Sequence, residues 1–368
     1  MRIVFMGENR FSPQYQRYEL LKLMAEENEV CYIEPPFHIM QHPMRALKTP
    51  ILTNWEKNLR VLHPRKIIPE RYCLSAPNLK LASREISGHL TAPADALILT
   101  RPTFWPLAKT VPAKHYVYYC LDAYTEYDEV RNWPGRGRLR LWNGLERKVL
   151  GESDLFLAVS HGLLYSRMGM ARRVEYLPHG LSPGTDQNSG SSEIPERIKH
   201  IPAPRVILLV HDQKRIDRDL LGQAAAAMPD VSFVVAGHGG LELNLPNIHK
   251  FGFIPRAELN RLLPWFEMGL LLYRWSRFHC YIGPIKFLEL PAFGLPVIAS
   301  GIPETYYWQS QYPGIIRAVN DAAELTAAVR SLLSAAGRPT QQEMEVFVVE
   351  NSWRRRYERL VQLLASLD

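Results

Sequence analysis

Residues 283–304, "GPIKFLELPAFGLPVIASGIPE", place charged residues just ahead of a glycine and an apolar run. If a helix begins at Pro284, Lys286 and Glu289 lie on one of its faces at i, i+3 spacing. Gly294 then ends the helix and lets the backbone turn into the apolar run "PVIAS". Such a turn can hold a nucleotide, because a lysine neutralises diphosphate and a carboxylate accepts hydrogen bonds from ribose. The alternative is a plain ion pair on the surface of the helix.

Short apolar runs alternate with longer amphipathic runs on both sides of this stretch. The apolar runs predict strands at 3–6, 30–33, 95–100, 116–122, 154–160 and 174–180, and again at 205–210, 231–237, 248–253, 268–273 and 296–299. Strands that alternate with helices favour an α/β fold with mostly parallel sheets covered on both faces. Ligands bind such sheets in the crevice outside the carboxyl ends of the strands.

The chain is long for a single compact core, so 368 residues predict two domains. Residues 182–204 are rich in Ser, Pro and Gly, and we interpret them as a linker. A first domain then occupies 1–181, and a second domain, which contains the opening stretch, occupies 205–350. The last segment, 351–368, predicts a helix with one apolar face, which we expect to pack back toward the first domain.

The composition is typical of a soluble globular protein, with 46% hydrophobic and 22% charged residues. No apolar run reaches the length of about 18 residues that a membrane-spanning helix needs. The N-terminal "MRIVFMGENR" has no signal-peptide core and predicts a first strand instead. The four cysteines are widely spaced and form no metal or disulfide pattern, which fits a reducing cytoplasm.

Positive charge is concentrated in the first half of the chain. Residues 1–180 hold 25 Lys and Arg against 18 Asp and Glu, so the whole net charge of +7 lies there. The segment 36–80 alone has eight Lys and Arg against two glutamates, with aromatic and apolar residues between them. A basic face predicts an anionic partner, either membrane headgroups, a lipid diphosphate or nucleic acid. The alternatives are a solvated surface or a long loop packed on its own domain, and the lack of a recognition motif argues against nucleic acid.

The opening stretch also resembles a known signature. In GT-B glycosyltransferases of the large family-4-type group, a glutamate stands five residues before the glycine of a G-x-P-V-[VI]-A-[ST] run, as Glu289 stands before Gly294 here. The segments "LPNIHKFGFIPRAELNRLLPWFEMGLLLY", "VYYCLDAYTEYDE" and "ERKVLGESDLFLAVS" resemble further parts of that group. "VCYIEPP" is similar to a subgroup from bacterial exopolysaccharide and teichuronic-acid assembly, including glucuronosyltransferases of the xanthan type. The resemblance implies two Rossmann-like domains that face each other across a cleft, the first for the acceptor and the second for the nucleotide sugar.

The resemblance also implies roles for individual residues of the second domain. Glu289 would bind the ribose and Lys286 would lie near the diphosphate. The loop "HDQKRID" (211–217) would offer Lys214 or Arg215 to the phosphates, although both could simply belong to an exposed polar loop. Phe253 and Ile254 would contact the base through backbone atoms.

Two positions depart from the pattern of this group. Many members carry a second glutamate eight residues before the ribose glutamate, where it touches the donor sugar, and this chain has Tyr281 there. We place Tyr281 and the nearby Gly283 in the donor site but leave open the donor sugar and the stereochemical outcome. Pro291 lies inside the predicted helix and should bend it, unless the helix begins later than Pro284.

Asp122 is the candidate for catalysis. It follows the apolar strand "YVYYCL" and would therefore point out of the carboxyl end of the sheet. An inverting transferase needs a base to take the proton of the acceptor hydroxyl, whereas a retaining one does not, and Asp122 would then only position the acceptor. A turn or N-cap aspartate is the alternative. Further candidates for contact with substrate are, in the same segment, Glu126 and Asp128, and elsewhere His161 and His179. Gly7 would leave room for the acceptor or a diphosphate near the first strand.

We therefore predict a glycosyltransferase that moves a sugar, with UDP as the expected nucleotide, to a lipid-linked or polysaccharide acceptor in cell-surface polysaccharide biosynthesis. We expect it to be cytoplasmic and peripheral to the inner face of the membrane. No cofactor or metal is expected, because we recognise no Asp-x-Asp motif and because Lys, Arg and helix amides can stabilise the leaving diphosphate. The alternatives are a GT-B nucleotide-sugar epimerase and a non-catalytic nucleotide-sugar-binding protein.

Overall fold

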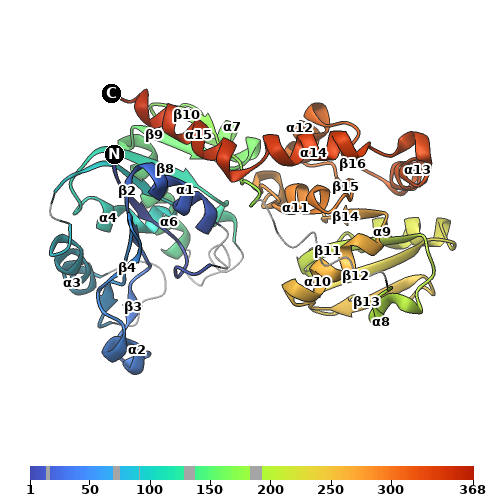
Figure 1. Cartoon of the computed structure of the whole chain (residues 1–368), viewed down its shortest axis with the longest axis horizontal. Coiled ribbons are helices and arrows are strands. Elements are labelled where there is room, and N and C mark those ends of the chain that lie inside the picture. Colours follow the sequence, from blue (N-terminus) through green and yellow to red (C-terminus); the bar gives the residue numbers. More distant parts are fainter. Residues whose placement is uncertain (14–16, 69–74, 91, 128–136, 183–192) are drawn as a thin grey trace. The chain divides into compact units, whose positions relative to one another are not determined.

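The computed structural model describes residues 1–368 except 14–16, 69–74, 91, 128–136 and 183–192 (Figure 1). It divides into two compact units. Unit 1 comprises Met1–His179 and Trp353–Asp368, and unit 2 comprises Gly180–Ser352. Asp128, one of the weaker predicted site residues, lies outside the described residues.

Unit 1 is built on an eight-stranded sheet with the order β10-β9-β8-β7-β1-β2-β5-β4. Its strands are β1 (Arg2–Met6), β2 (Glu29–Ile33), β4 (Leu52–Glu56), β5 (Leu59–Leu62), β7 (Ala94–Leu99), β8 (Ala113–Cys120), β9 (Leu155–Ala158) and β10 (Val174–Tyr176). All neighbours pair in parallel except β4, which returns antiparallel to β5. The central strands are apolar without alternation because both faces of the sheet are covered.

Part of the basic segment 36–80 belongs to this sheet. It forms β4 and β5, a separate two-stranded sheet of β3 (Phe37–His38) and β6 (Arg65–Lys66), and the short helix α2 (Pro43–Lys48). None of these strands was predicted. The hairpin of β4 and β5 turns at Lys57 and Asn58. Because this turn contains no glycine, the sequence pattern did not indicate a hairpin here.

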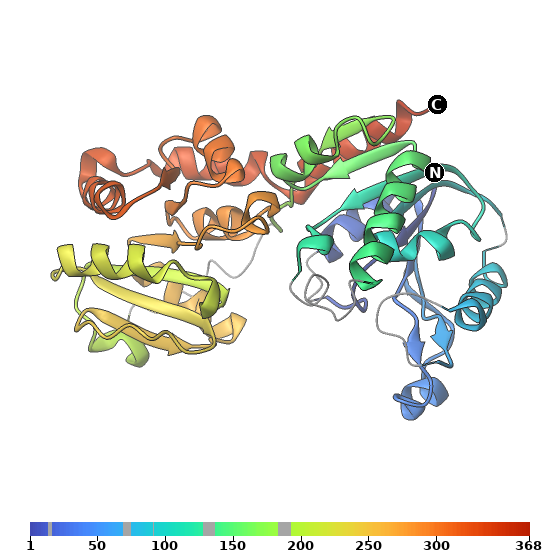
Figure 2. The ribbon, with the colours of Figure 1, turned by 180° about the vertical axis from the view of Figure 1, so that it is seen from behind.

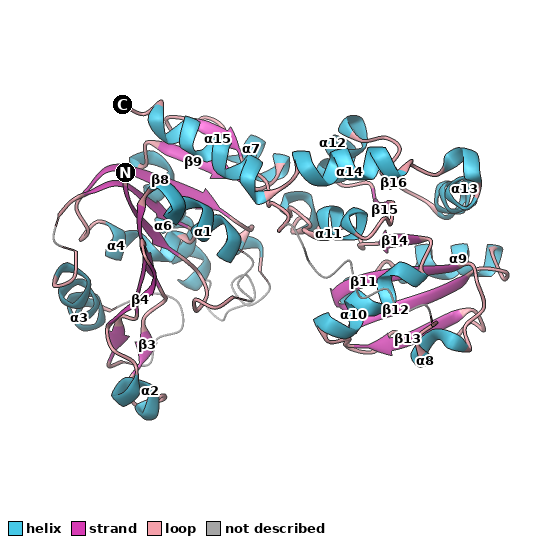
Figure 3. Ribbon diagram, in the orientation of Figure 1, coloured by secondary structure: helices cyan, strands magenta, loops and turns pink. Residues whose placement is uncertain are grey.

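The helices of unit 1 flank the sheet (Figure 3). They are α1 (Tyr18–Glu27), α3 (Ala76–Ser87), α4 (Trp105–Ala108), α6 (Gly137–Glu152), α7 (His161–Arg167) and the C-terminal α15 (Trp353–Ala365). Helix α15 packs on α1: the Tyr357 hydroxyl donates to Glu27 at 2.8 Å and accepts from Asn28 at 3.1 Å, and Arg354 pairs with Glu26 at 2.8 Å. The last helix of the chain thus completes the unit that the N-terminus begins.

Unit 2 has a six-stranded parallel sheet with the order β13-β12-β11-β14-β15-β16. Its strands are β11 (Arg205–Asp212), β12 (Ser232–His238), β13 (Ile248–Gly252), β14 (Met268–Leu271), β15 (Val297–Ser300) and β16 (Ile316–Val319). Counted within the unit, this is the order 3-2-1-4-5-6 of a Rossmann sheet. Its topological switch point lies between β11 and β14, where such sheets bind ligands at their carboxyl edge.

Two separate apolar cores cover the two faces of this sheet. Alternate residues of each strand enter opposite cores, as Ile207 and Leu208 of β11 do. The helices are α8 (Glu196–Lys199), α9 (Arg218–Ala227), α10 (Arg256–Leu262), α11 (Lys286–Ala292), α12 (Pro303–Gln311), α13 (Ala322–Leu333) and α14 (Gln341–Glu350). Helices α9 and α13 contribute to one core, and α10, α11 and α14 contribute to the other.

The predicted linker differs from what the structure describes of it. Residues 183–192 are outside the described residues, but α8 follows them, and Ile198 and Ile201 are fully buried in a core of unit 2 together with Leu181. The second half of 182–204 is therefore part of the folded unit. The Ser- and Pro-rich composition of this segment indicated a linker, but its two isoleucines pack into the core of unit 2.

Residues 283–304 fold as the helix α11 followed by the strand β15. The helix begins at Lys286 and not at Pro284. It ends in a Schellman motif: the Leu295 amide donates to Leu290 at 3.1 Å, and the Gly294 amide donates to Pro291 at 2.9 Å. Gly294 takes a φ of +76°, which glycine adopts without strain. The helix begins later than Pro284, and Pro291 still lies inside it, with no amide to donate to the Phe287 carbonyl four residues earlier.

Candidate active site

Glu289 has two cationic partners in unit 2. Its carboxylate lies 2.5 Å from the Lys286 ammonium and 2.7 Å from the Arg256 guanidinium. The lysine comes from the same face of α11, as the i, i+3 spacing predicts. Arg256 is the first residue of α10, just after the predicted base-contacting residues, and it was not predicted. The carboxylate therefore joins α11 to the segment that follows β13.

The Glu289 carboxylate is charged. Burial raises the pKa of this group, but the charges of Lys286 and Arg256, each hydrogen-bonded to it, outweigh burial and hold the pKa below its ordinary value. An ionised carboxylate has only acceptors to offer, so it can receive the hydroxyl donors of a ribose. The carboxylate that forms the ion pairs is thus the same one that the sequence predicts as the ribose-binding group.

The loop after β11 places its two cations differently. Lys214 is exposed, and its amide is fixed by the Asp212 carboxylate at 2.9 Å. The Arg215 guanidinium lies 4.7 Å from the centre of the Phe278 ring, and the Arg215 carbonyl accepts from the Arg274 amide at 2.9 Å. Arg215 is therefore tied to the segment that follows β14, across the switch point, and Lys214 reaches into solvent.

Aromatic rings lie at the carboxyl ends of β12 and β13. The ring of Phe253 is 59% exposed and stacks on that of His238 with 4.6 Å between centres and 18° between planes. His211 meets His238 edge-on at 5.6 Å. Ile254 instead turns its side chain into the core, so only its backbone could face a ligand. His238 was not among the predicted site residues, because its contacts with Phe253 and His211 exist only in the fold.

The segment between β14 and α11 holds Tyr281, Gly283 and a buried histidine. Tyr281 and Gly283 are half-buried, ahead of α11. His279 stacks on Tyr273 at 4.8 Å, and its Nδ1 donates to the Arg274 carbonyl at 2.8 Å. Burial, together with the charges of Arg215 and Arg274, lowers the pKa of His279 to about 4, although the bond to the carbonyl acts in the opposite direction.

His279 is consequently neutral near pH 7, and its Nε2 is buried without a hydrogen-bond partner in the part of the chain that the structure describes. A buried acceptor without a donor costs free energy. No sequence pattern distinguishes this histidine from a surface one, because its burial comes from Tyr273 and Phe278 around it.

An Asp-x-Asp spacing does occur in this unit, at Asp217 and Asp219. The Asp217 carboxylate caps α9 by accepting from the Leu220 amide at 3.0 Å, and Asp219 is exposed. Within the described ranges no three His, Cys, Asp or Glu side chains gather as metal ligands would. The spacing therefore has a helix-capping explanation.

In unit 1, Asp122 lies just beyond β8, where the strand prediction places it. Its Oδ2 accepts from the Tyr127 hydroxyl at 2.5 Å and its Oδ1 from the Ala123 amide at 2.8 Å. These bonds hold the turn that leads into a short 3-10 helix, Tyr124–Glu126. The turn role is thus realised in the structure, and the catalytic role stays a prediction. Glu126 ends the same 3-10 helix and is half-buried.

Arg101 is a cation of this region that sequence reasoning missed. It follows β7, and its guanidinium lies 5.3 Å from the Tyr124 ring centre and 5.6 Å from that of Trp142. Its Nε is buried without a hydrogen-bond partner among the residues described. An arginine held by two rings keeps its remaining donors available for an anion.

Three further candidates, His179, His161 and Gly7, are each surrounded by other residues of unit 1. Burial, then the charges of Arg17 and Arg356, lowers the pKa of His179 well below its ordinary value, so the imidazole is neutral. His161 begins α7 with its ring 4.1 Å from that of Tyr176. Gly7 was expected to leave room for a ligand, but a Cβ there would lie 1.9 Å from the Tyr32 hydroxyl, so Tyr32 already fills that room.

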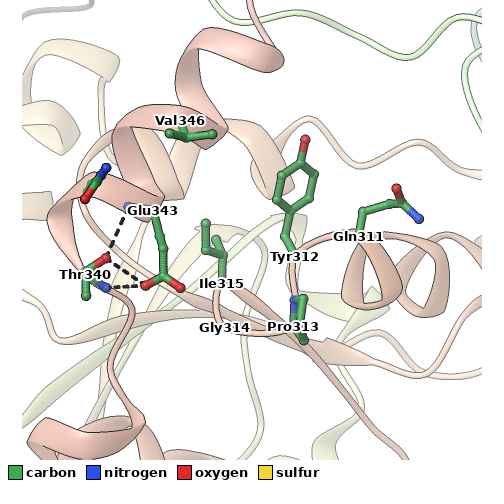
Figure 4. Close-up of a pocket in the computed structure, with 9 residues that line it drawn as sticks. Gln311, Tyr312, Pro313, Gly314, Ile315, Thr340, Glu343 and Val346 are labelled. Carbon is green, nitrogen blue, oxygen red and sulfur yellow. Dashed lines mark hydrogen bonds between the residues drawn. The ribbon is translucent and has the colours of Figure 1, made fainter.

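A pocket of about 330 Å³ lies between α12 and α14 of unit 2 (Figure 4). It adjoins the start of β16, whereas the candidate donor residues follow the ends of strands, so it lies at the opposite edge of the sheet. The Glu343 carboxylate in it accepts from the Thr340 amide at 2.7 Å and closes a capping box. This pocket is therefore separate from the candidate site.

The fold can now be compared with known proteins. Over its whole length the chain superposes on sucrose-phosphate synthase from Thermosynechococcus elongatus with a TM-score of 0.69 and 14% identity, covering 100% of this chain and 98% of the other. HepE from Anabaena, in complex with UDP-glucose, gives 0.66 and 12%, covering 100% of both chains. WaaG, a glycosyltransferase involved in lipopolysaccharide biosynthesis, gives 0.58 and 13%, covering 98% of this chain and 99% of the other. The chain has the GT-B fold.

Sequence comparison gives a more limited result. No protein-family model matches the chain. TuaH of Bacillus subtilis (strain 168), assigned by name as a teichuronic acid biosynthesis glycosyltransferase, is 25% identical over 138 residues, which is 35% of this chain and 35% of TuaH. The match thus spans about a third of that relative. Among the described helices of the GT-B chain, none is long and apolar enough to cross a membrane.

Proposed function

We propose that the chain is a glycosyltransferase that moves a sugar from a UDP-sugar to a lipid-linked or polysaccharide acceptor in cell-surface polysaccharide biosynthesis. The observation that carries this proposal is the charged Glu289, held by Lys286 and Arg256 beside the carboxyl edge of a Rossmann sheet. A carboxylate with two adjacent cations matches the two halves of a nucleoside diphosphate, its ribose hydroxyls and its phosphates.

For the donor, ribose hydroxyls would take over the acceptor positions of Glu289. Lys286 and Arg256 would then be able to turn toward the diphosphate, joined by Lys214 or Arg215 from the loop after β11. The exposed Phe253, stacked on His238, offers an aromatic face beside which the base can lie. Tyr281 and Gly283 would contact the donor sugar or its diphosphate.

For the transfer, the acceptor oxygen forms a bond to the anomeric carbon while the bond from that carbon to the diphosphate breaks. In an inverting reaction the proton of the acceptor hydroxyl passes to Asp122, and the leaving UDP carries the electron pair. In a retaining reaction Asp122 would orient the acceptor only. The cations around Glu289 would stabilise the charge that develops on the leaving diphosphate.

The relatives support this proposal in general terms. TuaH is assigned by name to teichuronic acid biosynthesis, and HepE was solved with UDP-glucose. The basic, partly apolar surface of segment 36–80 supports a peripheral position at the inner face of a membrane.

A thermal-shift screen with UDP, GDP, ADP and dTDP tests the donor assignment. We expect UDP to raise the unfolding temperature most, because a ligand that binds only the folded state stabilises it. The screen is repeated with excess chelator, and the shift should persist if no metal takes part. If no nucleotide stabilises the protein, the transferase proposal is wrong.

A further inference from the structure

A second pocket, of about 320 Å³, lies in unit 1 beyond the carboxyl ends of β1 and β2. Its polar lining comes from the loop after β1, which contributes Glu8, Asn9 and Arg10, and from the basic segment, which contributes Gln41, His42 and Lys66. The pocket therefore lies at the edge of the sheet where an α/β unit binds its ligand. The donor site does not use it.

The charge of this pocket favours an anion. Arg10 and His42 are exposed, and their side chains have no hydrogen bond or ion pair with any described residue. The carboxylate of Glu8 is neutralised by Arg17 at 2.9 Å. With Lys66 the cations exceed the carboxylates, and the amides of Asn9 and Gln41 add neutral donors. A phosphate, which accepts several hydrogen bonds and attracts cations, suits such a lining.

The wall of the pocket is fixed by the small sheet of β3 and β6. His38 opposes Lys66 in the register. The His38 Nε2 donates to the Ile67 carbonyl at 2.8 Å, and its Nδ1 accepts from the Gln41 amide at 3.0 Å. Both ring nitrogens are thus occupied, and His38 holds the two segments together. The site is built by the fold and does not depend on flexible side chains alone.

Exposed apolar side chains directly follow both of these strands. Met40 is 77% exposed, Ile67 52% and Ile68 38%, and Met44 of α2 is 59% exposed. The buried Asn78 of α3 accepts from the Ile67 and Ile68 amides at 2.8 and 3.1 Å and donates to the Ile68 carbonyl at 3.0 Å. The two isoleucines are therefore held at the surface by a buried polar residue. Neighbouring exposed apolar residues of this kind mark an interaction surface.

We propose that this pocket binds the diphosphate of a lipid-linked acceptor, while Met40, Met44, Ile67 and Ile68 contact its lipid chain at the membrane surface. This inference rests on the proposed transferase function and names the acceptor class. A cationic recess next to an apolar rim requires a ligand whose anion and hydrocarbon are joined. A free phosphate would leave the rim unused. In both views α2 projects beyond the main sheet of unit 1 (Figure 1 and Figure 2), so it can enter an interface without burying that sheet.

Vesicle flotation of the full chain tests this proposal. The vesicles contain phosphatidylcholine alone, phosphatidylcholine with phosphatidylglycerol, or phosphatidylcholine with a polyprenyl diphosphate at the same surface charge. We expect tightest binding to the third kind. Arg10→Gln should weaken that binding about five-fold, the effect of one cation near an anionic surface. Lys148→Gln, which removes an exposed cation of α6, is the matched control and should bind like the wild type.

The rim is tested by Ile67→Ser, which should weaken binding to both charged vesicles because it removes apolar contact. Equal binding to phosphatidylglycerol and polyprenyl diphosphate would overturn the proposal, since the surface would then recognise charge alone. So would wild-type binding by Arg10→Gln, or failure of the wild-type protein to bind any of the vesicles. A UDP thermal shift on the same preparations separates the outcomes: a retained shift with failed vesicle binding rejects this inference and leaves the transferase proposal standing.

Discussion

The candidate sites of the two units differ in how far apart along the chain their residues lie. In unit 2, Lys286 and Glu289 are three residues apart and meet on one helix, and Arg256 joins them from 33 residues away. In unit 1, His179 meets Arg17 across 162 residues, and His38 meets Ile67 across 29. Lys286 and Glu289 of the candidate donor site are thus neighbours in the sequence, whereas the contacts in unit 1 join residues that only the fold brings together.

The two sites also use their charges differently. The Glu289 carboxylate is paired with Lys286 and Arg256. A ligand that donates hydrogen bonds to this carboxylate would replace these two cations. Asp122 accepts from a hydroxyl and an amide of its own turn, and Arg101 lies against the rings of Tyr124 and Trp142. Substitution in unit 2 should therefore change nucleotide affinity, whereas substitution in unit 1 should change turnover.

The largest expected effect is that of Asp122→Ala on transfer. Loss of a general base lowers turnover about 10²- to 10⁴-fold, and Asp122→Asn should do nearly the same while keeping the turn. UDP affinity, measured by calorimetry, should stay at the wild-type value because the substitution lies in unit 1. Glu152→Gln, which removes an exposed carboxylate at the end of α6, serves as the control. Wild-type turnover in Asp122→Asn would remove Asp122 from catalysis and leave it a turn residue.

A smaller effect is expected for Glu289→Ala on nucleotide binding. Its removal costs the charge-assisted bonds to ribose, about 1–3 kcal/mol of UDP binding free energy. Calorimetry with UDP and with uracil separates the cause, because uracil lacks the ribose and should bind both proteins alike. Glu242→Ala, which removes an exposed carboxylate of the same unit, is the control. Equal UDP affinity in Glu289→Ala and the wild type would contradict the assignment of the ribose site.

The same contrast explains what the sequence could predict. The parallel sheets follow from strands and helices that alternate, and the turn at Gly294 follows from a helix stop before an apolar run. The strands β4 and β5 were missed because they lie at the edge of the eight-stranded sheet and because the turn between them has no glycine. Arg101, His238, His279 and Arg256 were missed because a position becomes a site only when the fold brings rings or carboxylates to it. Gly7 was misread because its neighbour Tyr32 is 25 residues away in the chain.

The smallest expected effect compares one glycine from each unit. Gly294 has a positive φ and no atom within 4 Å of an added Cβ, so Gly294→Ala should destabilise unit 2 through backbone strain alone, by about 1–2 kcal/mol. Gly144 lies inside α6 with equally open space, so Gly144→Ala should instead stabilise unit 1 by roughly 1 kcal/mol. Urea unfolding, followed by probes specific to each unit, measures both. If Gly294→Ala left the stability of unit 2 unchanged or raised it, the turn at Gly294 would not need glycine, and the helix stop on which the donor-site prediction rests would lose its physical basis.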